Sequence, residues 1–111
     1  MSMQIIKVSS FTTIPGARFV KDGDGSAEEF FNKYVKAPLK EAINKNTQIK
    51  IDFDDTWGYA SSFINELASR IFKLTSKDFE DISKTISLKS DDEPGLIDRF
   101  EEEYGKAVRG E

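Results

Sequence analysis

Residues 49–72, IKIDFDDTWGYASSFINELASRIF, contain the signals that decide the fold. Apolar and polar residues alternate over 49–53, which predicts a short strand. Over 62–73 the apolar residues recur every three or four positions, which predicts a helix with one wide apolar face. Ser61 and Ser62 stand at the start of that helix. The sequence therefore predicts two hydroxyl groups where a buried strand passes into a helix, a position at which α/β proteins often bind ligands.

The remainder of the chain alternates between strand and helix signals. Pro38 lies inside the first long helical pattern, and we expect it to kink or split that helix near Lys36–Ala37 because proline lacks a backbone donor. The alternation predicts an α/β fold with a largely parallel or mixed sheet and helices packed over it. We expect strands at 3–8, 17–20 and 85–89 beside the strand at 49–53, and helices at 27–44, 77–83 and 94–108 beside the helix at 62–73.

The length and composition predict a single acidic domain, residues 1–111, with few of the side chains that commonly act in catalysis. The 111 residues carry a formal net charge of −4, which argues against sequence-independent binding of nucleic acid. The chain holds no Cys and no His, so thiolate zinc sites and the commonest general base are missing. We therefore expect neither an enzyme nor a cofactor. No apolar run approaches the roughly 18–20 residues that span a bilayer, and the N-terminus has no long apolar leader. We expect no membrane association and a cytoplasmic location.

Ser61 and Ser62 have two interpretations. A serine at the N-cap of a helix accepts a hydrogen bond from a free backbone N–H and contributes about 1 kcal/mol. The same free N–H groups and the helix dipole favour an anion, so a phosphate on one serine would be tolerated there. One serine can cap the helix while the other faces a partner, and position alone leaves both interpretations open.

Three acidic residues follow or end the strand over 49–53, namely Asp52, Asp54 and Asp55. Carboxylates hold magnesium when they converge from several elements. Asp52 is expected to point away from the apolar face of its strand. Asp54 and Asp55 are interpreted as the polar end of the strand, so no metal site is expected.

A possible ligand loop consists of Asp22, Gly23, Gly25 and Ser26. Its DGDG sequence lacks the later ligands of a calcium loop and is not a phosphate loop. Ser26 and Glu29 have the spacing of a capping box, which predicts a helix start. The simpler interpretation is a turn before a capped helix, and the functional one is a lid or a partner contact.

Trp57 and Tyr59 flank Gly58 in the turn before the serine pair. Aromatic side chains at such a place can anchor a partner. They can equally close the end of the hydrophobic core. The sequence leaves these two roles open, whereas the acidic run Glu101–Glu103 is interpreted as a solvated helix face.

The chain resembles the small bacterial STAS-like family of unknown function. The resemblance is carried by the strand, the turn and the helix that follows it, with a Gly-Tyr-x-Ser-Ser-Phe pattern at Gly58–Phe63. It covers nearly the whole chain, and its motifs stand in the same order. The further matching segments are Arg18-Phe19, Asp22-Gly23, Gly25–Phe30, Pro38-Leu39 and Ser90–Asp92.

The resemblance implies a STAS-like α/β domain with a four- or five-stranded mixed sheet and helices mainly on one face. The wider STAS class includes anti-sigma-factor antagonists, in which a partner kinase of the histidine-kinase-like ATPase superfamily phosphorylates a serine in this turn. The resemblance makes Ser62 the first candidate phosphoacceptor and Ser61 the second. In this chain Ala60 replaces the acidic residue of that turn, and Phe63 replaces its glycine.

We therefore expect a protein-interaction and regulatory module that binds a protein partner through the turn and the second helix. The alternative is a small-ligand or nucleotide sensor without catalysis, with its cleft between residues 23–26 and 58–62. The sequence leaves the partner, the pathway and the oligomeric state open. The expected partner-binding residues are Trp57, Gly58, Tyr59, Ser61, Ser62, Phe63, Asn65 and Glu66.

Overall fold

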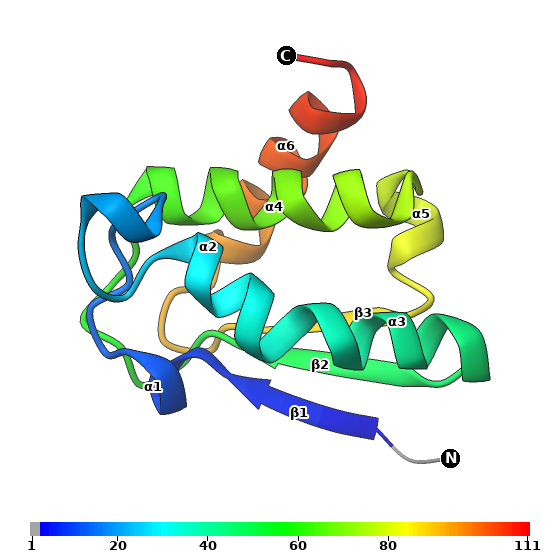
Figure 1. Ribbon diagram of the computed structural model, residues 1–111, viewed down its shortest axis with the longest axis horizontal. Helices are drawn as coiled ribbons and strands as arrows, with labels where there is room; N and C mark the ends of the chain where they lie inside the picture. Colours follow the sequence, from blue (N-terminus) through cyan, green and yellow to red (C-terminus); the bar gives the residue numbers. More distant parts are fainter. Residues whose placement is uncertain (1–2) are drawn as a thin grey trace.

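The computed structural model describes residues 3–111, so the first two residues of the predicted domain 1–111 lie outside the described range. Figure 1 shows a sheet at the base of the molecule with the long helices above it. The elements in chain order are strand β1 (Met3–Lys7), helix α1 (Val8–Phe11), a 3₁₀ turn η1 (Val20–Asp22), helix α2 (Ala27–Phe30), a π-helical turn η2 (Phe31–Val35), helix α3 (Lys36–Lys45), strand β2 (Gln48–Asp52), helix α4 (Ser61–Thr75), helix α5 (Phe79–Ile82), strand β3 (Ile86–Lys89) and helix α6 (Gly95–Val108).

The sheet places its strands in the order β1-β2-β3, and both neighbouring pairs are parallel. The register aligns Ile6 with Ile51 and Ile51 with Leu88. Because side chains alternate between the two faces of a strand, these three residues form an apolar row on one face. The alternation over 49–53 thus correctly predicted the central strand, which lies one residue earlier than expected.

The prediction of a four- or five-stranded mixed sheet is not reproduced in residues 3–111, which form three parallel strands. The predicted strand at 17–20 is wrong, because this segment is a bend that leads into η1. Its carbonyl groups have other partners: Ala17 accepts from the N–H of Ala27 at 3.0 Å, and Arg18 accepts from that of Glu28 at 3.2 Å. The segment therefore caps the start of α2 instead of pairing with a strand.

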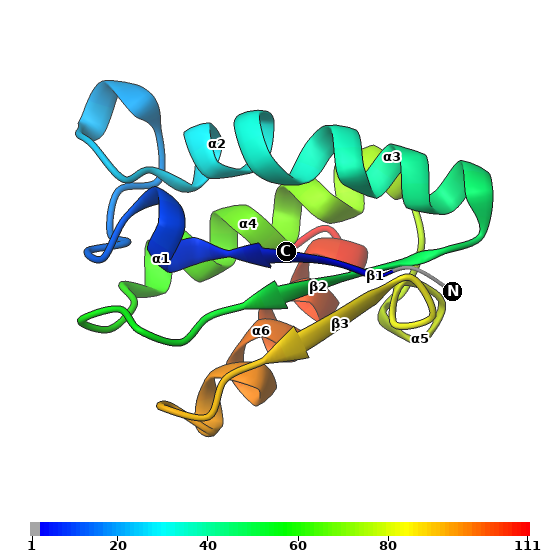
Figure 2. The same ribbon diagram turned by 90° about the horizontal axis from the view of Figure 1, so that it is seen from below.

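The helices α2, α3, α4 and α6 lie on the same side of the sheet, as predicted (Figure 1). The order of the strands explains this arrangement. Parallel strands are joined by right-handed crossovers. Because the strand order β1-β2-β3 follows the chain, both crossovers run in the same direction and lie on the same face of the sheet. Figure 2 looks onto the other face, over which none of α2, α3, α4 and α6 lies. There the β1 side chains Met3 and Ile5 are exposed.

The long helix over residues 27–45 is split near Lys36–Ala37, as predicted, because the π-helical turn η2 ends at Val35 and the regular helix α3 begins at Lys36. The N–H of Lys36 donates to the carbonyl of Phe31, a π-helical spacing that defines η2. A regular α-helix would direct the Tyr34 carbonyl at the proline ring. A widened turn just before the proline relieves this clash, and the chain remains helical on both sides of it.

One continuous core lies between the sheet and the helices. Phe30 and Phe63 pack with ring centroids 6.1 Å apart, and Phe53 and Phe100 are also 6.1 Å apart. These contacts join α2 to α4 and the end of β2 to α6. The aromatic core therefore fixes both helices relative to the strand that leads into the candidate site.

Candidate functional site

The turn between β2 and α4, taken with the first residue of that helix as residues 53–61, is held against a second loop, residues 12–16. The N–H of Trp57 donates to the carbonyl of Thr13 at 2.8 Å, and that of Ala60 donates to Pro15 at 3.2 Å. The Ser62 hydroxyl donates to the carbonyl of Gly16 at 2.9 Å. Three hydrogen bonds thus join segments far apart in the sequence, and they fix the turn at one end of the domain.

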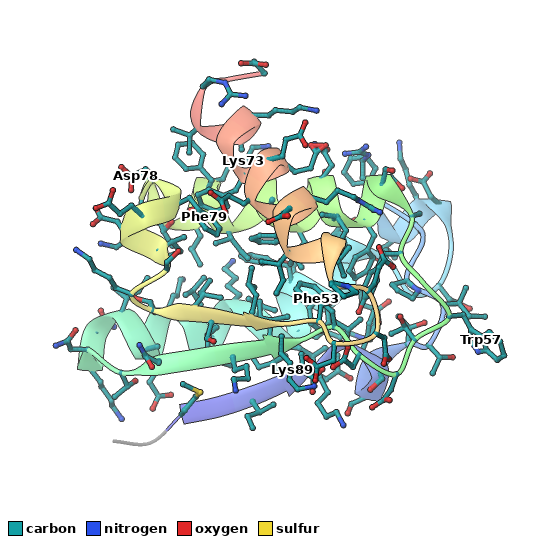
Figure 3. The ribbon with its side chains drawn as sticks, turned by 180° about the vertical axis from the view of Figure 1, so that it is seen from behind. Phe53, Trp57, Lys73, Asp78, Phe79 and Lys89 are labelled. Carbon is teal, nitrogen blue, oxygen red and sulfur yellow. The ribbon has the colours of Figure 1, made fainter. Side chains whose placement is uncertain are left out.

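The two aromatic residues of the turn have opposite roles. Trp57 is 87% exposed and projects from the end of the molecule (Figure 3). Tyr59 instead packs edge-on against Phe53, with centroids 5.4 Å apart, and its hydroxyl donates to the Phe53 carbonyl at 2.8 Å. Burial raises the pKa of the Tyr59 hydroxyl well above its ordinary value of 10.0. Tyr59 therefore closes the end of the core, and Trp57 remains available at the surface.

The serine pair forms the first turn of α4, and neither serine caps it. The cap position is Ala60, which has no side-chain hydrogen bond to offer, and its carbonyl accepts from the N–H groups of Phe63 and Ile64. The N-cap interpretation of the serines is therefore wrong. An N-cap residue has an extended backbone, and the last extended residue before α4 is Ala60, whereas Ser61 and Ser62 are already helical. Ser61 is exposed, whereas Ser62 is half-buried by its bond to Gly16.

Of the other predicted partner residues, Gly58 lies in the turn with a positive φ of 117°, and Phe63, Asn65 and Glu66 lie along α4. Phe63 is fully buried, and Glu66 is 8% exposed. The Glu66 carboxylate pairs with Arg18 at 3.5 Å and with Arg70 at 2.7 Å. Asn65 accepts a hydrogen bond from Arg18. Asn65 and Glu66 therefore attach the loop that carries Arg18 to helix α4. Their contacts are internal and hold these two segments together.

Charged residues at the ends of β2 and β3 form a cluster that we call the acidic junction, which consists of Asp52, Asp54, Lys89, Asp91 and Asp92. Asp54 is 5% exposed. One of its oxygens accepts from the N–H groups of Asp91 at 2.8 Å and Asp92 at 2.9 Å, and the other pairs with the Lys89 ammonium. The Asp52 carboxylate accepts from the N–H of Asp54 at 2.9 Å. The cluster thus ties the end of β2 to the end of β3.

The charge state of the junction follows from these bonds. The backbone N–H of Asp92, together with Lys89, lowers the pKa of the Asp54 carboxyl below its ordinary value of 3.8. Asp54 and Asp91 in turn raise the pKa of Lys89. Within residues 3–111, no group of three or more Asp, Glu, His or Cys side chains is arranged to hold a metal ion. The bonds of Asp54 and Asp52 make the junction an ion-pair and hydrogen-bond network between the two strand ends.

The possible ligand loop is built as a turn. Ser26 is fully buried, and its hydroxyl accepts from the N–H of Glu29 at 3.0 Å, as the capping box predicted. Gly25 has φ +73°, and a Cβ there would lie 2.9 Å from the Thr12 hydroxyl oxygen. Asp22 and Gly23 are exposed. The buried half of this loop supports α2, and only its tip faces solvent.

The geometry of the turn is poorly suited to a nucleotide. A hollow of about 200 Å³ beside it is lined partly by Trp57, Tyr59, Asp92 and Glu93, and carboxylates repel phosphates. The sheet also adds its strands in chain order, whereas α/β sheets bind ligands in the crevice formed where the strand order reverses. Neither feature favours the sensor alternative.

Sequence reasoning missed the part of the site that comes from residues 12–16. Ile14 is 70% exposed and follows Thr13, whose carbonyl holds Trp57. The Pro15-Gly16 pair indicated a turn but not its packing partner. An exposed aliphatic and an exposed aromatic side chain thus belong to the two loops that meet at one end of the domain.

The fold and this turn define a small α/β domain with a three-stranded parallel sheet, in which a serine pair opens the helix after the central strand. Residues 26–96 match the family described as STAS-like domain of unknown function (DUF4325), and the chain belongs to this family. The match runs from the cap of α2 into the first turn of α6 and contains the whole turn. No curated protein and no solved structure gives a significant match.

A separate finding concerns the helices. Across residues 3–111, none combines the length and the apolar content that crossing a membrane requires.

Proposed function

We propose that this chain is a protein-interaction module with a regulatory role, and that its partner binds the end of the domain formed by residues 12–16 and 53–61. The observation that carries the proposal is the exposure of Trp57. A tryptophan that is 87% exposed gains little for the fold. Large aromatic side chains are the commonest anchors of protein interfaces. Ile14 extends the apolar contact, and Ser61 is exposed in the same turn.

Phosphorylation of the serine pair is the regulatory step of this proposal. A histidine-kinase-like ATPase partner supplies ATP: the serine oxygen bonds to the γ-phosphorus, the bond to the β-phosphate oxygen breaks, ADP leaves, and a base of the partner takes the hydroxyl proton. The two serines would respond differently. On Ser61 the phosphate adds charge to an exposed helix N-terminus. On Ser62 it removes the donor to Gly16 and places an anion beside that carbonyl, which frees residues 12–16.

The family resemblance favours Ser62 and exposure favours Ser61. The discriminating experiment incubates the protein with ATP and a histidine-kinase-like ATPase from the same genome and measures the intact mass. We expect the mass of one phosphoryl group to be added, and to be lost in the Ser61→Ala/Ser62→Ala double variant. Each single variant then assigns the site. An unchanged mass with each such ATPase of that genome would remove phosphorylation from the proposal.

Partner binding is tested separately from phosphorylation. Trp57→Ala should weaken binding of the same ATPase at least about ten-fold, as for an interface anchor, measured by titration calorimetry. Val108→Ala is the matched control, since Val108 is an exposed apolar residue near the end of α6. Equal affinities of the wild type and Trp57→Ala would exclude the turn as the interface.

A further inference from the structure

A groove between α3 and α4 carries a charge pattern that the proposed partner surface does not use. Two adjoining hollows of about 320 Å³ each line up along it and share Leu74. Phe31 and Ile43 contribute further apolar surface from the side of η2 and α3. The α4 residues that line it lie in the middle and at the end of this helix, away from the turn that precedes Ser61.

Lysines stand on both sides of this groove. Lys36 and Lys40 are four residues apart on α3, so they share one helix face. Lys73, labelled on α4 in Figure 3, and Lys77, just after its end, have the same spacing. All four line the two hollows. We call this surface, with its apolar floor, the lysine groove.

These lysines lack acidic partners within the described chain. Six lysines form no ion pair within 4.0 Å in residues 3–111, and four of the six line the groove. The one acidic residue among the lining residues is Glu66, which is already paired with Arg18 and Arg70. The protein as a whole carries a net charge of −4, so the sign of the charge in the groove is opposite to that of the whole protein. The six lysines are Lys21, Lys36, Lys40, Lys50, Lys73 and Lys77.

We infer that the lysine groove binds an acidic amphipathic segment of another protein. Its apolar residues would fill the two hollows, and its carboxylates would meet the lysines on both sides, as when an amphipathic helix lies in an apolar groove. Charge complementarity of this kind selects the partner and speeds association. A nucleic acid fits less well, because it would continue past the groove onto the acidic remainder of the surface.

The test uses a fluorescein-labelled synthetic helix with leucines on one face and glutamates on the other, titrated with the full chain and followed by anisotropy. We expect saturable binding that weakens as ionic strength rises. A scrambled peptide of equal composition should bind at least about ten-fold more weakly, because it has no continuous apolar stripe. Labelled duplex DNA and anionic lipid vesicles serve as competing probes.

Two matched variants locate the binding. Replacing Lys36, Lys40, Lys73 and Lys77 by serine should reduce the affinity about ten-fold or more. The control removes the same charge from four lysines that are ion-paired in the structure, Lys33, Lys45, Lys84 and Lys106, and should change the affinity less than about two-fold. Arginine at the four groove positions should restore binding.

Several outcomes would overturn the inference. They are equal losses in the two variants, equal binding of the scrambled peptide, tighter binding of DNA or vesicles than of the helix, and no saturation by the helix. Because the Trp57→Ala variant should bind this peptide as the wild type does, failure here is distinguishable from failure of the proposed interface at the turn.

Discussion

The acidic junction and the lysine groove use charged residues in opposite ways. In the junction, Asp54 satisfies two backbone N–H groups and one ammonium group and is almost completely buried. In the groove, Lys36 and Lys73 are exposed and form no ion pair within residues 3–111. A charge whose partners are all internal stabilises the fold, and removing it is costly. A charge without internal partners is dispensable for folding and available for binding.

The largest effect is expected at the junction. Asp54→Ala leaves the N–H groups of Asp91 and Asp92 without their acceptor and removes one of the two carboxylate partners of Lys89, which keeps Asp91. Unsatisfied groups of this kind cost about 1–3 kcal/mol each, and water will reach part of the site, so we expect a loss of about 3 kcal/mol in unfolding free energy. Urea denaturation followed by circular dichroism measures it.

The control for that substitution is Asp55→Asn, because Asp55 has a positive φ of 66° that asparagine also tolerates. Asp55 is exposed and pairs only with Lys7, at 3.7 Å. We expect a change within about 0.5 kcal/mol, as for most surface ion pairs. Similar losses in the two variants would show that the buried bonds of Asp54 do not hold the strand ends together.

The junction also predicts a pH dependence. The pKa of Asp54 is lower in the folded protein than its ordinary value of 3.8, so its contribution is complete above that value and disappears as the pH falls through the folded pKa. The stability difference between the wild type and Asp54→Asn should be constant from about pH 5 to 7 and shrink below about pH 4. Urea titrations at each pH measure it. A difference that grows towards low pH would contradict the assignment of Asp54 as an ionised acceptor.

A smaller effect separates the two aromatic residues of the turn. Tyr59→Phe removes the hydroxyl that donates to the Phe53 carbonyl at 2.8 Å, and we expect a loss of about 1 kcal/mol. Trp57→Ala should change the stability by less than about 0.5 kcal/mol, because its side chain is almost fully exposed. Thermal or urea unfolding tests both. If Trp57→Ala proved the more destabilising, Trp57 would belong to the core and not to an interface.

Local patterns in the sequence were sufficient for most elements. The alternation around Ile51 predicted β2, and the three- and four-residue spacing around Leu67 predicted α4, because one face of each must be buried. Residues 17–20, Ala-Arg-Phe-Val, are too short a segment for a periodic pattern that separates a strand from a loop. Their structure is set by carbonyl groups that accept from Ala27 and Glu28, and such long-range bonds leave no local pattern.

The candidate site was predictable only in part for the same reason. The position of Ser61 and Ser62 at a strand-to-helix turn followed from the sequence. The sequence did not show that Tyr59 is packed inside while Trp57 is exposed. This difference depends on which of the two side chains donates a hydrogen bond to the carbonyl of Phe53. The lysine groove was also hidden. The spacing of Lys36 and Lys40 can be read from the sequence of α3, and Lys77 follows the end of α4 that carries Lys73. That these two pairs face one groove is a property of the packed structure.

The smallest change in stability is expected for the variant that should lose most of its peptide binding. The variant with serine at Lys36, Lys40, Lys73 and Lys77 loses four charges but no ion pair, so its unfolding free energy in urea should stay within about 0.5 kcal/mol of the wild type. Relief of repulsion between lysines four residues apart acts in the stabilising direction, and lower helix propensity of serine acts against it. A loss of several kcal/mol would mean that the lysines hold α3 and α4 in place. If the stability is unchanged and peptide binding is lost, these lysines form a surface for a partner. Substitution of Asp54 is expected to have the opposite character, because it lowers the unfolding free energy.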